Sequence, residues 1–109
     1  MKWNDLTSVE QLNDIVKQSY QRPQLIFKHS TRCSISSVAK NRLEREKEPE
    51  HIDFYYLDLI RYKDVSNRVT EAFKVYHESP QVLLIKNGEC IYEESHGAII
   101  MEEIIENAK

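Results

Sequence analysis

The residues with the clearest chemical potential lie in the stretch Ser30–Ser36, which contains Cys33. The apolar run Leu25–Phe27 precedes this stretch and a helical pattern follows it, so we expect Cys33 at a strand-to-helix junction. Backbone N–H groups at a helix start favour a negatively charged sulfur, and the neighbouring Arg32 adds a positive charge. The thiolate is the nucleophile in thiol–disulfide exchange, so this setting predicts a reactive cysteine.

The alternative for Cys33 is a small buried hydrophobic residue, a common role for free cysteines. Its polar neighbours argue against a dry pocket, and Lys28 or His29 would add further positive charge. Ser36 stands three residues after Cys33, where a dithiol enzyme carries the second cysteine that releases the substrate. A serine cannot form that disulfide, so the pattern predicts a one-thiol site. The Ser36 hydroxyl either donates a hydrogen bond to the Cys33 sulfur or lies on the helix surface.

The composition is that of an ordinary globular chain, with 40% hydrophobic and 30% charged residues. The length of 109 residues fits a single domain over residues 1–109. The formal net charge of -3 argues against a nucleic-acid partner, and no apolar run approaches the ~20 residues that cross a bilayer. Met1–Leu6 lacks the apolar core of a signal peptide, so we expect a cytoplasmic protein with reduced thiols. We expect a monomer, and the spacing of the four histidines predicts no metal site.

Periodicity and turn signals predict helices near residues 8–20, 34–48, 65–76 and 100–108, and strands near 24–29, 54–59, 81–86 and 89–94. Asn87-Gly88 predicts a type I′ turn between the last two strands, because that turn needs positive φ twice. In the second helix, an apolar stripe is expected from Ile35, Val38, Ala39 and Leu43. Arg42–Glu48 is expected to be a solvated face of mixed charge. The element order predicts an α/β fold with a central mixed β-sheet of about four strands flanked by four helices.

Several segments resemble thioredoxin. Val75–Glu89 is similar to the segment with the cis-proline, a strand and an Asn-Gly hairpin, and Gly97-Ala98 resembles the glycine after the last strand. Asp58 resembles the aspartate that closes the strand before the third helix, so the chain resembles a thioredoxin-like fold over nearly its whole length. Cys33-Ser34-Ile35-Ser36 resembles the active-site motif of YtxJ-type monothiol bacilliredoxins, from bacteria that use bacillithiol in place of glutathione. Those proteins usually have proline after the cysteine, where this chain has Ser34.

This resemblance implies a thiol–disulfide oxidoreductase that removes bacillithiol from S-bacillithiolated proteins through a mixed disulfide on Cys33. Bacillithiol is then the cosubstrate, no cofactor is tightly bound, and a second bacillithiol releases the first. Arg32, Ser34 and Ser36 would support the thiol. Pro80 resembles the cis-proline that faces the cysteine in this fold, the Ser79 backbone would pair with an extended substrate, and Gly97 would let a ligand approach the backbone closely. The alternatives without a functional role are that Pro80 is an ordinary trans-proline at the start of a strand and that Gly97 is a simple turn glycine.

Cys90 is the other cysteine and is not expected to be a resolving partner. It lies two residues after Gly88, at the turn end of the hairpin, whereas the resemblance places Gly97 at the active-site end. Seven residues of strand span about 20 Å, and a disulfide needs Cα atoms within about 7 Å. We therefore expect Cys90 to be a core or edge-strand residue.

Two other functions fit part of the sequence. Monothiol glutaredoxins, which carry iron–sulfur clusters, share the Cys-x-x-Ser outline, but they also carry a double glycine that Glu94–Gly97 lacks. A thioredoxin-like redox sensor, or a module that docks partners at Ser79-Pro80, would need the same fold without turnover.

Overall fold

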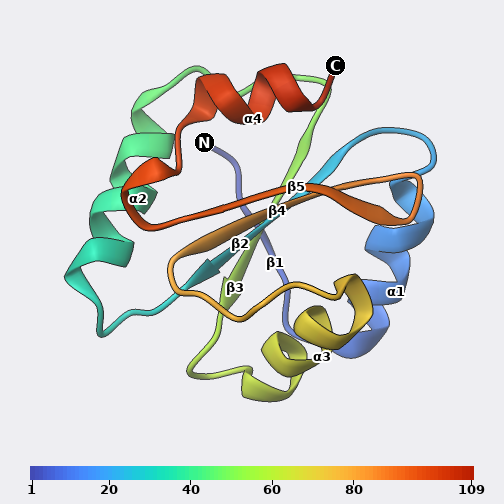
Figure 1. Cartoon of the computed structure of the whole chain (residues 1–109), viewed down its shortest axis with the longest axis horizontal. Coiled ribbons are helices and arrows are strands. Elements are labelled where there is room, and N and C mark those ends of the chain that lie inside the picture. Colours follow the sequence, from blue (N-terminus) through green and yellow to red (C-terminus); the bar gives the residue numbers. More distant parts are fainter.

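The computed structural model describes residues 1–109 and shows a sheet covered by helices on both faces (Figure 1). The helices are α1 (Val9–Gln18), α2 (Ser34–Arg45), α3 (Lys63–Phe73) and α4 (Met101–Asn107), with a short 3-10 helix η1 (His96–Ala98). The strands are β1 (Asn4–Asp5), β2 (Gln24–His29), β3 (Asp53–Asp58), β4 (Gln81–Lys86) and β5 (Glu89–Ser95). No helix combines the length and apolar character that crossing a membrane requires.

The sheet has the strand order β1-β3-β2-β4-β5. The pairs β1–β3 and β2–β3 are parallel, whereas β2–β4 and β4–β5 are antiparallel. The mixed sheet and the four helices confirm the predicted α/β fold, with five strands in place of about four. The additional strand is β1, which is too short to show a periodic pattern. Trp3 precedes β1, stacks on Phe27 with ring centroids 5.5 Å apart, and donates a 2.7 Å hydrogen bond to Glu44.

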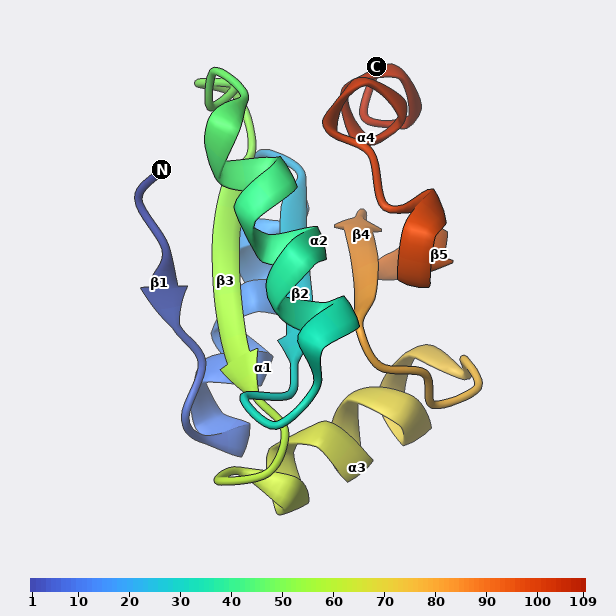
Figure 2. The same ribbon diagram turned by 90° about the vertical axis from the view of Figure 1, so that its left-hand side faces the viewer.

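The core consists of two apolar clusters, one on each face of the sheet. Along β2, Leu25 and Phe27 pack with residues of α2 and α4, whereas Ile26 packs with residues of α1 and α3. This alternation is the period-two geometry of a strand whose two faces are both covered. Figure 2 shows α2 crossing in front of β3 and β2, and α1 behind them. All six residues of β2 are buried, including the polar residues Lys28 and His29.

The second helix turns a different face to the core from the one its apolar residues predict. Ile35 and Val38 are each 56% exposed, so their assignment to the apolar stripe is wrong. Ser36, Ala39 and Leu43 are the buried residues of α2, at a spacing of three and then four. The buried serine is tolerated because its hydroxyl has hydrogen-bond partners. Two helix ends also differ: α2 stops at Arg45, and α3 stops at Phe73.

The end of α3 has a local cause. Lys74 follows it with a left-handed backbone, φ 54° and ψ 46°, which breaks the helical repeat. Tyr76, predicted to continue the apolar spacing of this helix, is instead 92% exposed in the loop before Pro80. The hairpin agrees with its prediction, because Asn87 has φ 53° and Gly88 has φ 80°, as a type I′ turn requires.

Candidate active site

Cys33 is the N-cap residue of α2 and follows the end of β2 by a short turn. The turn is closed by a hydrogen bond from the Cys33 N–H to the Ser30 carbonyl at 3.2 Å. The Cys33 carbonyl accepts from the Ser37 N–H at 3.2 Å, which starts the helix. The thiol is half-buried and makes no disulfide. No acidic residue stands in the first turn of α2, so no carboxylate offsets the positive end of the helix dipole next to Cys33.

Ser36 neither donates a hydrogen bond to the Cys33 sulfur nor lies on the helix surface, the two alternatives that the sequence left open. It is fully buried, and its Oγ lies 2.6 Å from His29 Nδ1. The same oxygen accepts a hydrogen bond from the Ser30 N–H at 3.1 Å. Since Ser30 supplies one proton, the hydroxyl has its own proton free to donate to Nδ1 of a neutral His29. The hydroxyl therefore fastens the turn around Cys33 to the end of β2.

His29 does not serve as a cation beside the thiol. Burial lowers the pKa of His29, and the nearby Lys40 lowers it further. The ring also packs against Tyr56 and Phe27, with centroids 5.4 and 5.7 Å away. A neutral ring is the form that accepts the Ser36 proton, so hydrogen bond and pKa shift agree. The alternation of side chains along β2 could have predicted this burial from the sequence, because it puts His29 on the face of the sheet that α2 covers.

Lys28 points to the opposite face and supports the loop before Pro80. Its Nζ lies 2.7 Å from His77 Nδ1 and donates to Gln81 Oε1 at 3.3 Å. Gln81 in turn donates to the Tyr76 carbonyl at 3.0 Å, so it anchors this loop to the start of β4. Burial lowers the pKa of Lys28 to about 8. Lys28 was expected to add positive charge next to Cys33. In the structure its side chain instead holds the loop before Pro80, through His77 and Gln81.

The Pro80 loop lies at the same end of the sheet as Cys33. Lys28 is paired with Gln81 in the β2–β4 register, so Ser79 and Pro80 stand beside the chain that leaves β2 toward Cys33. The Ser79–Pro80 peptide bond is cis, and Pro80 is buried. The Ser79 Oγ is buried without a hydrogen-bond partner. An unpaired buried hydroxyl is uncommon and marks a place where a ligand could supply the missing partner.

The segment that carries Gly97 completes this end of the sheet. The His96 N–H donates to the Pro80 carbonyl at 3.1 Å, so η1 adjoins the Pro80 loop. A Cβ placed on Gly97 would meet no atom within 4 Å, so open space faces this residue. Arg42, expected on a solvated face, is half-buried and donates from Nη1 to the carbonyls of Gly97 at 2.9 Å and Ile99 at 3.3 Å. Sequence reasoning missed this contact, because its partners are backbone atoms of a distant segment.

The structure thus brings Cys33, Ser36, Ser79, Pro80 and Gly97 to one end of the sheet. The two remaining predicted residues, Arg32 and Ser34, are exposed beside Cys33 and make no side-chain hydrogen bond or ion pair.

Cys90 lies far from this group, as predicted. The β4–β5 register pairs Gln81 with Ser95 and Ile85 with Cys90, so five residues of strand, about 16 Å, separate Cys90 from Ser95. A register shift between Leu84 and Ile85 turns Cys90 toward the α1 and α3 face, on the other side of the sheet from α2. Burial raises the pKa of the Cys90 thiol to about 11.

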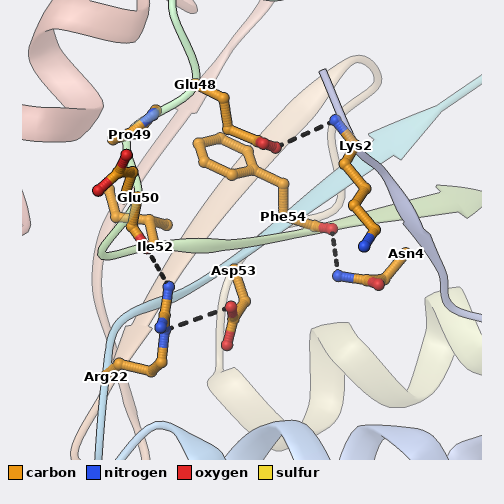
Figure 3. A pocket seen from close by; sticks show the side chains of 9 residues that line it. All are labelled: Lys2, Asn4, Arg22, Glu48, Pro49, Glu50, Ile52, Asp53 and Phe54. Atoms are coloured by element: carbon orange, nitrogen blue, oxygen red, sulfur yellow. Dashed lines mark hydrogen bonds and ion pairs between the residues drawn. The ribbon is translucent and has the colours of Figure 1, made fainter.

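A polar pocket of about 270 Å³ lies at the opposite end of the sheet from Cys33 (Figure 3). Among the contacts that join residues of its lining, Arg22 Nε lies 3.2 Å from Asp53 Oδ1, and Glu48 accepts a hydrogen bond from the Lys2 backbone N–H at 3.1 Å. This pocket contains no cysteine or histidine and is not part of the thiol site. No group of three or more His, Cys, Asp or Glu side chains is placed to hold a metal ion.

Comparison with known proteins agrees with the geometry. One solved structure, a protein proposed to be an oxidoreductase with a thioredoxin fold, is 27% identical with a TM-score of 0.84, covering 96% of this chain and 92% of that one. The thioredoxin of Malassezia sympodialis matches with a TM-score of 0.80 at 14% identity, over 99% of this chain and 92% of that one. The thioredoxin of Fasciola hepatica also gives 0.80, at 16% identity over 97% and 99%. The fold is therefore the thioredoxin fold.

The family comparison is more specific. The model of the family described as monothiol bacilliredoxin BrxC matches residues 4–104, which include every residue of the candidate site. Together with the neighbouring thioredoxin-fold oxidoreductase, this match supports a thiol-redox function. Because the match spans nearly the whole chain, the protein belongs to the monothiol bacilliredoxin BrxC family.

Proposed function

We propose that the protein is a monothiol thiol–disulfide oxidoreductase that removes bacillithiol from S-bacillithiolated proteins. The observation that carries this proposal is the isolation of Cys33 from a second thiol. The position three residues on is Ser36, whose hydroxyl is engaged by His29, and Cys90 lies on the other face of the sheet. A site of this kind can accept one thiol group but cannot expel it unaided.

The exchange has two steps. The Cys33 thiolate attacks the bacillithiol sulfur of a protein–bacillithiol disulfide, forming a Cys33–bacillithiol disulfide and releasing the protein thiolate. A second bacillithiol thiolate then attacks the bacillithiol sulfur held on Cys33. This step returns the Cys33 thiolate and releases bacillithiol disulfide, so each step forms one disulfide bond and breaks one.

We assign the surrounding residues to supporting roles. The Arg32 guanidinium and the first N–H groups of α2, which begins at Ser34, stabilise the thiolate. Ser36 fixes the turn that holds Cys33. Ser79, Pro80 and Gly97 form the wall along which the substrate chain lies, with the unpartnered Ser79 hydroxyl as one contact. We further propose that the chain acts as a single domain over residues 1–109, as a monomer, in the cytoplasm.

The test is formation and loss of an adduct. The reduced protein is mixed with bacillithiol disulfide, and the products are digested and analysed by mass spectrometry. We expect one bacillithiol per chain, on Cys33, and release of that group when free bacillithiol is added. Cys33→Ser serves as the negative control, and Cys90→Ala should behave as the wild type.

Three outcomes contradict the proposal. No adduct, or an adduct confined to Cys90, would remove the enzymatic role of Cys33. An adduct that added bacillithiol does not release would favour a redox sensor over an enzyme.

A further inference from the structure

A pocket of about 180 Å³ opens next to Cys33, between α2 and η1. It is lined by Ser34, Ile35, Val38, Ala39, Arg42, His96 and Gly97. The first two lining residues directly follow Cys33 in the chain, so a group attached to that sulfur starts at the edge of the pocket. The walls include Ile35 and Val38, the two large hydrophobic side chains of α2 that are exposed, each by 56%. Gly97 and the helix start at Ser34 have roles in the proposed exchange, whereas Ile35, Val38 and Arg42 have none.

Arg42 gives the pocket a fixed positive charge. Its Nη1 is held by the carbonyls of Gly97 and Ile99, so the guanidinium is anchored against η1. The N–H groups of Nε and Nη2 have no hydrogen-bond partner, and no carboxylate pairs with Arg42. The other basic residue of the lining, His96, is already 3.5 Å from Glu78. An anchored guanidinium with one edge free is suited to bind a carboxylate through two parallel hydrogen bonds.

We propose that this pocket binds the malate end of bacillithiol, with Arg42 as the carboxylate-binding residue; the proposal rests on the function proposed above. Bacillithiol links a cysteinyl group through glucosamine to malate, which has two carboxylates. About ten covalent bonds separate its sulfur from the far carboxyl carbon, or roughly 12 Å when extended. Nine residues of helix separate Cys33 from Arg42, about 13 Å at the usual rise, and a long side chain leans back toward the helix start. The molecule therefore reaches the guanidinium while its sulfur is bonded to Cys33.

The remaining lining fits the middle of the same molecule. Ile35 and Val38 offer aliphatic surface to the C–H groups of the sugar ring, and Gly97 leaves the opposite wall without a side chain. Arg42 thus makes the site selective for a thiol that carries a distant carboxylate, while Cys33 alone performs the exchange.

The experiment measures the second-order rate constant for attack of Cys33 on two disulfides, by quenched-flow mass spectrometry. One probe is bacillithiol disulfide, and the other is the disulfide of cysteinyl-glucosamine, which lacks malate. For Arg42→Gln we expect a loss of roughly 10- to 100-fold with bacillithiol disulfide, the range of a charge-assisted contact. The probe without malate should react at a rate within about twofold of the wild type, because it offers Arg42 no carboxylate. With bacillithiol disulfide, the rate constant of Arg42→Lys should lie between those of Arg42→Gln and the wild type. Arg45 is an exposed arginine on the same helix, so the rate constant of Arg45→Gln should equal that of the wild type.

The outcomes separate the two proposals. If the wild type reacts with bacillithiol disulfide and Arg42→Gln reacts equally fast, the pocket assignment is wrong and the proposed function stands. An equal loss with both probes would also overturn the assignment, because the substitution would then act on the structure of η1 or on Cys33. If the wild type reacts with the probe lacking malate but not with bacillithiol disulfide, both proposals fail.

Discussion

The two ends of the β2–β4–β5 sheet each hold one cysteine, in opposite surroundings. At one end, Cys33 caps a helix beside buried polar residues that nearly all have hydrogen-bond partners. At the other, Cys90 lies among apolar side chains of α1 and α3, next to a tight hairpin turn. The first setting holds the thiol that we propose as the nucleophile, whereas in the second setting the thiol packs against apolar side chains. The helix start and the polar network distinguish the two thiols, while both are partly exposed.

The largest expected contrast is in alkylation. Burial raises the pKa of Cys90 from 9.0 to about 11, so at pH 8 its thiolate fraction is roughly 100-fold below that of an unperturbed thiol. We expect iodoacetamide to modify Cys90 more slowly than a free cysteine peptide by at least that factor. The Cys90 rate should rise about tenfold per pH unit until pH nears 11. Cys33 should be modified at least as fast as the peptide.

Peptide mapping of each cysteine over time gives both rates, and the Cys33→Ser variant isolates Cys90. Equal rates of modification for Cys33 and Cys90 at pH 8 would contradict the predicted difference in reactivity between the two ends.

The next contrast concerns Ser36, which holds the Cys33 end together. In Ser36→Ala, His29 Nδ1 and the Ser30 N–H both lose their partner. Unsatisfied buried groups cost about 1–3 kcal/mol each, so we expect the free energy of unfolding to fall by roughly 2 kcal/mol or more. The thiol remains, so the variant should still form the Cys33 adduct.

Denaturant unfolding measures this loss, with Ser37→Ala, an exposed serine on the same helix, as the control. A similar, small change for both variants would mean that the buried contact adds nothing.

Sequence reasoning succeeded for features that depend on neighbouring residues. The strand-to-helix junction at Cys33, the turn at Asn87-Gly88 and the remoteness of Cys90 follow from local patterns and element lengths. It failed where a pairing between distant residues decides the outcome. The face of α2 is one case: periodicity favours burying Ile35, whereas the His29 contact makes Ser36 the better buried residue.

Arg42 and β1 show the same limit. A charged residue on an amphipathic helix is normally solvated, and only the position of η1 reveals the carbonyls that Arg42 binds. The two residues of β1 have no pattern of their own and are held by pairing with β3 and by the packing of Trp3. Tertiary contacts made by a single side chain leave no periodic trace in the sequence.

The smallest expected contrast between the two ends is in the pH dependence of the free energy of unfolding. At the Cys33 end, this dependence comes from Lys28. Burial lowers the pKa of Lys28 from 10.5 to about 8, so between these values the unfolded chain binds a proton that the folded chain has released. Stability therefore rises with pH in this range, by at most about 1.4 kcal/mol per unit and by roughly 1 kcal/mol from pH 8 to 9. In Lys28→Met this rise should disappear, whereas Lys47→Met, at an exposed lysine, should keep it.

The raised pKa of Cys90 acts in the opposite direction above pH 9, because the unfolded thiol then loses its proton before the folded one. The raised pKa values of Tyr55, Tyr56 and Tyr92 oppose the rise above pH 10. Cys90 and these tyrosines are present in both the wild type and Lys28→Met. Subtracting the free energy of unfolding of Lys28→Met from that of the wild type at each pH therefore leaves the contribution of Lys28. Urea unfolding at pH 8.0, 8.5 and 9.0 supplies the curves. If the difference stays constant over this range, Lys28 does not titrate there, and the network around His77 and Gln81 holds it in its charged form.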